Sequence, residues 1–338
     1  MARWFLCLCA LALASAAARA DEVRLLNGDR ISGEILAKSG ESLTLRTESM
    51  GELVIRWRDV AALSISAPTE ILLQGEDAPV RGTLRPDANG GMVLYGADGV
   101  ARPVSLADIA YLNPKPFESG RGTSYSGHAM LSAASASGNT RSDRVLGEAE
   151  LEARAKDYRY ALNGRIDRRN EPLVETQSAW LLGANYDRYF TERQFGYVRG
   201  SLEHDRAKDI DRRSTAGLGY GVQVLDTPKA QLSLRAGLDY VVVNRLADAG
   251  ERYPALGWGV KASYSPWGPR LQFFHEDEGF WNLEDTGVVT VRSKTGVRVP
   301  LIAHFNATAQ LNVDWERSPA PGRVPTDRTL LLGVDYSF

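Results

Sequence analysis

The residues of this chain best suited to acid–base chemistry are its four histidines, two of which stand among carboxylates. Glu203-His204-Asp205 and His275-Glu276-Asp277-Glu278 each place an imidazole beside acidic side chains, an arrangement that can orient a general base or hold a cation. The sequence has neither a GxSxG nucleophile turn nor an HExxH metal spacing. We therefore interpret both motifs as parts of a charged rim and predict no catalytic, cofactor or metal residues, hence no enzyme. A hydrolase that uses His204 or His275 with a serine is the less favoured alternative.

A second set of charged residues recurs at alternate positions within otherwise apolar segments. Successive side chains of a β-strand point to opposite faces, so this spacing puts the charges on one face of a sheet. An Arg or Lys facing lipid at the bilayer midplane costs about 2–4 kcal/mol, so in a membrane barrel such residues belong in the lumen. The predicted lumen-lining residues are Glu148, Glu150, Glu152, Arg165, Arg235, Asp239, Arg292, Lys294, Arg298, Asp314 and Asp335. They either line a narrow water-filled pore or pair across a small lumen and close it, and the sequence leaves both possibilities open.

The segments that carry these charges have the pattern of long β-strands. From Phe305 to Glu316, apolar residues occupy every odd position and polar residues every even one, which no helix would separate into faces. About twelve such segments lie between residues 124 and 338, in keeping with the even strand numbers of bacterial barrels. Many exceed the ~5–6 residues of a soluble strand and suit a tilted membrane crossing. We therefore predict an all-β chain with a C-terminal antiparallel transmembrane β-barrel of about twelve strands.

The connections between these segments alternate between short and long. Lys156-Asp157 and Thr191-Glu192-Arg193 are short, whereas residues 167–176, 206–213, 244–254, 276–287 and 316–328 form long polar stretches. Outer-membrane barrels have short periplasmic turns and long outer loops, so both ends of this region are expected on the periplasmic side. Aromatic residues near the segment ends are expected to form interface girdles. They are Tyr158, Tyr160, Tyr189, Phe190, Phe195, Tyr197, Tyr264, Trp267 and Phe305 near the short turns, and Tyr253, Phe280, Trp281 and Trp315 near the long loops.

The last predicted strand carries a pattern typical of targeting. Leu330, Leu332, Val334, Tyr336 and Phe338 alternate with smaller or polar residues, and the sequence stops on the aromatic ring of Phe338. A terminal strand of this form resembles the signal by which the barrel assembly machinery recognises outer-membrane proteins. We therefore predict that Tyr336 and Phe338 act as the barrel-insertion signal, and that the barrel contacts outer-membrane lipid.

The first twenty residues have the pattern of a secretory signal peptide. Arg3 precedes a short apolar stretch, and Ala18-Arg19-Ala20 offers small residues for cleavage before Asp21. Both cysteines, Cys7 and Cys9, lie in this segment, so the exported chain is expected to have no thiol or disulfide. Its loss removes two of the 40 basic residues against 42 acidic ones, and this small acidic excess argues against a nucleic-acid partner.

Residues 21–115 contain an internal repeat with a period of about 47–49 residues. The first copy spans 21–66 and the second 67–115. The matching positions are Asn27-Gly28 with Gln74-Gly75, Gly33 with Gly82, and Asp59-Val60 with Asp108-Ile109. Each copy resembles a small SH3-like or Sm-like β-barrel, too small for a large core alone, so we expect the two to pack together. A linker at 116–123, rich in glycine, separates them from the barrel at 124–338.

The C-terminal region resembles the YdiY-like family, known as salt-induced outer-membrane proteins and as domain of unknown function 481. The resemblance covers about residues 124–338 and is carried by segments such as Ser137-Gly138-Asn139-Thr140, "DRYFTERQFGYVRGSLEHDR" and "LLLGVDYSF". The family implies an outer-membrane barrel without an established activity, and its name refers to induction by salt. The N-terminal repeats lie outside it.

Together these features predict a protein of the cell outer membrane with its N-terminal region in the periplasm. Its expected role is passive passage of small solutes, or envelope maintenance under osmotic stress. The alternative is a non-conducting structural or binding barrel whose residues 21–115 contact peptidoglycan or an envelope protein.

Overall fold

The computed structural model describes residues 20–87, 91–97, 99–136, 142–170, 177–227, 229–247 and 249–338. Residues 1–19 of the predicted signal peptide and the Ser137-Gly138-Asn139-Thr140 segment lie outside these ranges. The chain divides into two compact units, and the main part of the second runs from Pro114 to Phe338. Among the described residues, no helix has both the length and the apolar character needed to span a bilayer.

The N-terminal unit consists of nine strands that pair into one antiparallel sheet. Their order along the sheet is β4-β3-β2-β1-β5-β6-β7-β8, and β9 pairs with both β2 and β5. The strands are β1 (Asp21–Leu25), β2 (Arg30–Ser39), β3 (Ser42–Thr47), β4 (Gly51–Arg56), β5 (Val60–Leu73), β6 (Val80–Pro86), β7 (Met92–Gly96), β8 (Ala101–Val104) and β9 (Ile109–Leu112).

The two sequence repeats have the same strand pairing within this sheet. In the first copy β1 pairs with β2 and with the start of β5; in the second, the end of β5 pairs with β6 and β9. A short 3-10 turn precedes the returning strand in each copy, at Trp57–Asp59 and at Leu106–Asp108. Because β5 serves both copies, they form one continuous sheet.

A single apolar core holds the N-terminal unit together. Val23, Leu45 and Leu63 from the first copy and Leu84 and Ile109 from the second belong to the same buried cluster. A repeat of under 50 residues buries little surface by itself, and the shared core compensates for this. The expectation that the copies pack together is confirmed.

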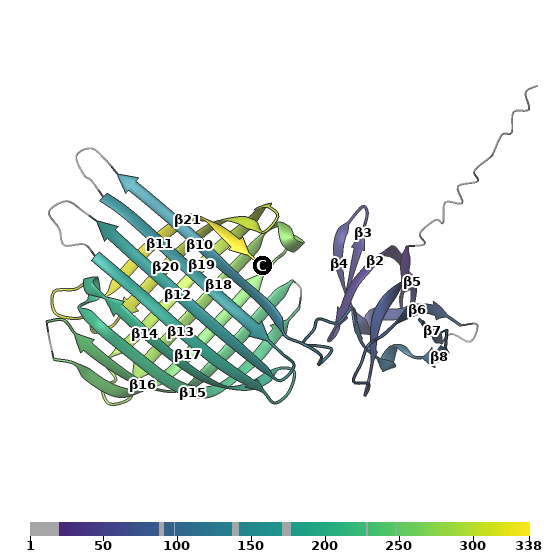
Figure 1. Ribbon diagram of the computed structural model, residues 1–338, viewed down its shortest axis with the longest axis horizontal. Coiled ribbons are helices and arrows are strands. Elements are labelled where there is room, and N and C mark those ends of the chain that lie inside the picture. Colours follow the sequence, from purple (N-terminus) through teal and green to yellow (C-terminus); the bar gives the residue numbers. More distant parts are fainter. Residues whose placement is uncertain are drawn as a thin grey trace, which may run out of the picture. The chain divides into compact units, whose positions relative to one another are not determined.

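The second unit is a closed antiparallel barrel of twelve strands, as the alternating segments predicted (Figure 1). Each strand pairs with its sequence neighbours, and β21 returns to β10. The strands are β10 (Ser124–Ala136), β11 (Ser142–Arg154), β12 (Tyr158–Asn170), β13 (Gln177–Tyr189), β14 (Gln194–Asp205), β15 (Ile210–Asp226), β16 (Ala230–Arg245), β17 (Glu251–Tyr264), β18 (Gln272–Asn282), β19 (Val289–Ile302), β20 (Phe305–Glu316) and β21 (Thr326–Ser337).

The barrel places polar side chains inside and apolar side chains outside. Along β20 the side chains of Asn306, Thr308 and Gln310 are buried in the interior, whereas Phe305 and Leu311 on the opposite face are exposed. The same alternation follows the other strands, because neighbouring residues of a strand point to opposite faces. The interior of this barrel is therefore the polar side, the reverse of the N-terminal unit.

The predicted contrast between short turns and long loops is smaller than expected. β15, β17 and β18 extend into stretches predicted as loops, so the connections there shrink to residues 206–209, 246–250 and 283–288. At the other end the turns cover residues 155–157, 190–193 and 265–271. The strand segments that were predicted as loops are rich in charged residues because they face a charged lumen. Charge alone does not distinguish such a strand from a loop.

The barrel closes where β21 meets β10. Four residue pairs join these strands, from His128 with Ser337 to Leu131 with Val334. The backbones of Gly127 and Phe338 then exchange two hydrogen bonds of 3.1 Å. Tyr336 and Phe338 both lie on the outer face, with ring centroids 6.2 Å apart. The predicted insertion signal thus coincides with the closing edge of the barrel, and its role in insertion stays a prediction.

Candidate functional site in the barrel lumen

The lumen contains a cavity of about 440 Å³ surrounded by charged side chains. Eight of the predicted lumen residues line this cavity: Glu148, Glu150, Glu152, Arg165, Arg235, Arg292, Lys294 and Asp314. Three do not: Asp239, Arg298 and Asp335, which are held in buried contacts away from it. The cavity is therefore polar and mixed in charge rather than of one sign.

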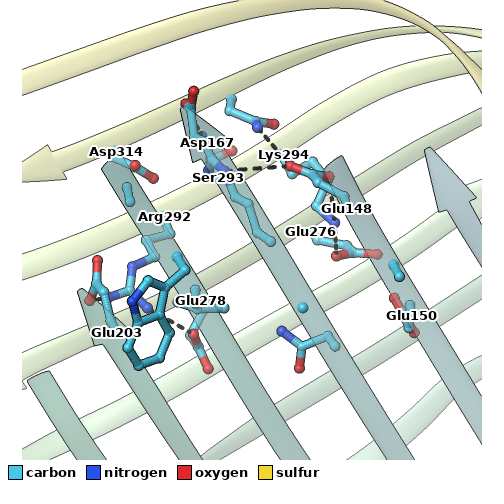
Figure 2. A pocket seen from close by; sticks show the side chains of 18 of the residues that line it. Glu148, Glu150, Asp167, Glu203, Glu276, Glu278, Arg292, Ser293, Lys294 and Asp314 are labelled. Carbon is cyan, nitrogen blue, oxygen red and sulfur yellow. Dashed lines mark hydrogen bonds and ion pairs between the residues drawn. The ribbon is translucent and has the colours of Figure 1, made fainter. Parts of the chain in front are cut away.

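Acidic residues on β11 form one wall and are paired with cations from the opposite side (Figure 2). Glu148 and Glu150 stand two positions apart, so their side chains share the inward face. Lys261 of β17 makes an ion pair with Glu150 across the lumen. Lys294 of β19 lies 3.1 Å from a carboxylate oxygen of Glu276 and 3.7 Å from one of Glu148. Lys294 and Glu276 lie on adjacent strands. The contacts of Lys261 with Glu150 and of Lys294 with Glu148 join strands that are not neighbours in the barrel, so these two contacts narrow the lumen.

A second group of ion pairs crosses the lumen near the 206–209 connection. Arg292 of β19 pairs with Glu203 of β14, and Arg213 of β15 lies 2.7 Å from Glu316 and 3.3 Å from Glu203. Lys208 reaches Asp314 at 2.8 Å. Burial by itself would lower the pKa of Lys208, but Asp314 and the other nearby carboxylates outweigh it and raise that pKa. Lys208 therefore stays charged and keeps its pair with Asp314 intact.

The buried pair of Arg199 and Asp239 explains why Asp239 does not line the cavity. The guanidinium donates two hydrogen bonds, of 2.7 and 2.6 Å, to the two carboxylate oxygens and a third, of 2.8 Å, to Glu278. Gly217 and Gly257 face this pair, and a Cβ at either position would overlap the Asp239 carboxylate. Glycine on the neighbouring strands thus provides the space for a bidentate ion pair against the wall.

Arg298 and Asp335 form the other contact outside the cavity. Their side chains lie 3.1 Å apart, and the Asp335 side chain is fully buried. Asn306 donates a hydrogen bond of 3.2 Å to the same carboxylate. This cluster lies beside the closing edge of the barrel, because Asp335 is paired with Met130 of β10.

Arg235 differs from the other predicted cations in its partner. It donates a hydrogen bond of 3.2 Å to the side-chain oxygen of Asn185, which lies on β13, three strands away from its own strand β16. Its stem lies over Gly259, where a Cβ would come within 3.0 Å of it. This lumen-crossing contact involves an uncharged acceptor and is therefore weaker than the ion pairs above.

Several aromatic residues predicted for the outer girdles lie inside the lumen instead. Tyr189, Phe195 and Tyr197 form a buried inward cluster, and Tyr253 and Phe280 belong to another. The ring of Phe195 occupies the space in front of Gly221, and the Tyr197 hydroxyl that in front of Gly219. The girdle prediction is wrong at these positions, because inward glycines on β15 and β16 make room for rings. It agrees with the exposed positions of Tyr160, Phe190, Tyr264, Trp267, Trp281 and Phe305.

The histidine motifs divide between the two faces of the barrel wall. His204 and His275 point outward, where His204 forms a hydrogen bond with the Asp211 carbonyl and His275 with the Thr295 hydroxyl. His128 lines the cavity near Glu150. Among the described residues, no group of three or more His, Cys, Asp or Glu side chains has a geometry suited to a metal ion.

Sequence reasoning missed several inward charges, above all Arg199, Glu203, Lys261, Glu276 and Glu278. The sequence predicts Glu276 and Glu278 on a rim before a long loop, but both lie in β18 and face the lumen. The signal was present in their spacing, since Phe274, Glu276, Glu278 and Phe280 alternate with Phe273, His275, Asp277 and Gly279. A face that mixes aromatic rings with carboxylates does not stand out as polar.

The barrel region matches one protein family and is similar to several solved structures. Residues 129–338 match a family described as a protein of unknown function, DUF481. Similar solved structures include the NanC porin, at 8% identity and a TM-score of 0.42, covering 63% of this chain and 100% of that one. The KdgM porin has 13% sequence identity and a TM-score of 0.35, and the match covers 64% of this chain and 99% of that one. The outer-membrane channel DcaP of Acinetobacter baumannii has 10% identity and a TM-score of 0.30, and the match covers 64% of this chain and 96% of that one. No curated protein matches the chain.

Proposed function

This chain belongs to the DUF481 family, and we propose that it is an outer-membrane channel for the passive passage of small polar solutes. The observation that carries the proposal is the charged cavity of about 440 Å³ enclosed by a twelve-stranded barrel. Twelve strands enclose a space between the filled interior of an eight-stranded barrel and the open channel of a porin. Mixed charge favours hydrated solutes without selecting strongly for one sign.

The outer surface supports placement in a membrane. Leu218, Leu238 and Leu332 expose 65%, 59% and 68% of their surface, and all three face outward from the barrel wall. A wall of exposed leucines is unfavourable in water, and lipid is the solvent that suits it. Barrels of this kind belong to the bacterial outer membrane, with the chain ends on the periplasmic side. The N-terminal unit is then periplasmic.

The lumen-crossing ion pairs set the width of the proposed channel. Lys261 with Glu150 and Arg292 with Glu203 connect opposite walls. A solute passes beside these pairs, and removing both partners of one pair widens the path without leaving a buried charge unpaired. Conductance is therefore expected to be small in the natural protein and larger in a double variant.

Planar-bilayer recording of the purified full chain tests this proposal. We expect small conductance steps from the natural protein and larger steps from Lys261→Ala combined with Glu150→Ala. The matched control is Arg188→Ala combined with Asp157→Ala, which removes an exposed pair at a turn and should leave the steps unchanged. Absence of steps in any salt, from both the natural protein and the double variant, would contradict the channel.

A second candidate is a closed barrel that anchors a binding module, favoured by the aromatic cluster and ion pairs that fill much of the lumen. In this proposal the two N-terminal copies are SH3-like modules that contact peptidoglycan or an envelope protein, and the barrel serves envelope integrity under osmotic stress. Deleting residues 21–115 should then abolish capture of peptidoglycan sacculi while the barrel still migrates differently on a gel before and after boiling. Equal capture by both forms would contradict it.

Neither proposal includes an enzymatic step. His204 and His275 face outward. His204 forms a hydrogen bond with a backbone carbonyl and His275 with the Thr295 hydroxyl, so neither of these contacts is to a serine nucleophile. Replacing both with Ala should leave lipid and protein turnover in the envelope unchanged. A loss of turnover would instead support a hydrolase.

A further inference from the structure

The four consecutive polar residues of β18, His275 to Glu278, point alternately to the outer face and to the lumen of the barrel. Glu276 and Glu278 point into the lumen and pair with Lys294, Arg199 and Arg292. His275 and Asp277 alternate with them and therefore point outward. A carboxylate and an imidazole thus stand two positions apart on the surface that is expected to contact lipid.

This polar patch lies at the middle of the outer wall. Asp277 is the central residue of β18, and the outward rings of Phe273 and Trp281 stand four residues to either side, at the ends of the strand. Ser293 and Thr295 are paired with Asp277 and His275 in the register of β19, so four polar side chains adjoin. The outward faces of β16 and β20 carry leucine, alanine, valine and aromatic residues at the same positions.

The patch is held in place by specific contacts. The indole nitrogen of Trp258 on β17 donates a hydrogen bond of 3.1 Å to one oxygen of Asp277. Its ring lies across Gly279, where any Cβ would overlap it. His275 shares a 2.7 Å hydrogen bond between its Nδ1 and the Thr295 hydroxyl. Within the part of the chain that the structure describes, these contacts leave the second oxygen of Asp277 and the Nε2 of His275 available to a partner.

We propose that this patch, formed by Trp258, His275, Asp277, Ser293 and Thr295, is the interface through which two copies of this chain associate in the membrane. An ionised group facing lipid costs most at the midplane, and acyl chains have no group that could pair with it. A second copy offers the complementary pair. Its imidazole can donate to the free oxygen of Asp277, and its carboxylate can accept from His275.

Symmetry favours this occupant over an unrelated protein. Two copies inserted in the same direction are related by a rotation about the membrane normal, which brings identical patches to the same depth. In a two-fold pair the donor and acceptor on each patch are both used, so the contact is closed and limited to two copies. Valines 291 and 297 flank the patch on β19 and supply apolar contact around it.

Cross-linking in a bilayer tests the interface directly. The full chain, purified without its predicted signal peptide, is reconstituted into phosphatidylcholine vesicles with Val297→Cys, beside the patch, as its single cysteine and treated with a short bismaleimide. The control is Leu238→Cys, an outward position on β16 away from the patch. We expect a covalent dimer from the first and almost none from the second. Only monomer from both, or equal dimer from both, would overturn the proposal.

A second experiment asks whether the polar residues drive association. His275→Leu combined with Asp277→Leu should lower the dimer fraction at least tenfold in sedimentation in density-matched detergent. The matched control His204→Leu alters an outward histidine on β14 outside the patch and should leave it unchanged. A double variant that dimerises like the natural protein would overturn the proposal.

The inference rests on the proposed membrane location but not on conductance. A gel shift between unheated and boiled samples shows whether each variant has inserted as a barrel. A barrel that is found in the membrane fraction but is monomeric contradicts only the proposed interface. A chain found in the soluble fraction contradicts the membrane location as well.

Discussion

The N-terminal unit and the barrel are built from the same element with opposite polarity. Val23, Leu45 and Leu84 fill the interior of the first unit, and charged pairs such as Arg46 with Glu34 lie on its surface. In the barrel the ion pair of Arg199 and Asp239 is buried inside, while leucines cover the outside. Alternation of side chains is common to both, so the difference comes from the solvent that each outer face meets.

This inversion changes what stabilises each unit. The first depends on apolar burial, which is worth roughly 25 cal/mol per Å² removed from water. The barrel interior gains little from that effect and instead satisfies its buried charges with one another, because an unpaired buried charge is costly. The same substitution should therefore have different consequences in the two units, and this can be measured.

The largest contrast is expected from placing an arginine at a leucine of each unit. Leu63 is fully buried in the N-terminal core, so Leu63→Arg should prevent that unit from folding. Leu238→Arg on the outer wall should cost about 2–4 kcal/mol and leave the barrel formed. Limited proteolysis of residues 21–113 and the gel shift of the barrel report the two units separately. A protease-resistant N-terminal unit in Leu63→Arg would contradict the assigned core.

Removing one partner of an ion pair should instead destabilise the barrel more than the N-terminal unit. Arg199→Leu leaves the fully buried Asp239 carboxylate unpaired and should cost about 3–5 kcal/mol, measured as a shift in the urea midpoint of barrel unfolding. The control is Arg46→Leu in the N-terminal unit, whose pairs with Glu34 and Glu52 are exposed and worth under about 1 kcal/mol. Equal shifts would show that the lumen is more hydrated than the buried pair indicates.

The same comparison shows what the sequence could predict. Strict alternation in Phe305–Glu316 and its counterparts is sufficient for the number and approximate position of the barrel strands, because period two has one structural solution. The repeat equivalence of Gly33 and Gly82 was also visible, since each glycine must lie against the backbone of a facing strand. Alternation does not predict which side chains pair with one another across the lumen of the closed barrel.

The site was therefore only partly predictable. Glu150 and Lys261 are 111 residues apart, and their pairing depends on the curvature and closure of the barrel. The sequence predicts Phe195 and Tyr197 on the outside because aromatic rings near turns favour the membrane interface. They face inward because Gly219 and Gly221 on the next strand leave space for them. Polarity identifies a face reliably only where the residues on it are of one kind.

A smaller effect is expected from adding a methyl group at matching positions of the repeats. A Cβ at Gly33 or Gly82 would overlap the carbonyl oxygen of Arg46 or Tyr95. Gly33→Ala and Gly82→Ala should each destabilise the N-terminal unit by about 1–3 kcal/mol in thermal unfolding. The barrel control, Gly164→Ala, meets its nearest atom at 3.9 Å and should be close to neutral. Neutral effects at both glycines would contradict the close approach of the facing strands.

The smallest effect concerns a difference between the repeats themselves. The Asp108 carboxylate accepts hydrogen bonds of 2.7 Å from the backbone and the hydroxyl of Ser105, and these lower the pKa of Asp108 below its usual 3.8. The matching Asp59 pairs with Arg56 instead. A lowered pKa means that the ionised form stabilises the fold above pH 3.8 and that this contribution is lost as the pH falls through the lowered value. Asp108→Asn should therefore lower the thermal midpoint of the N-terminal unit slightly at pH 7, and the difference from the natural protein should vanish in more acidic buffer. A difference that persists at low pH would assign the loss to packing rather than to charge.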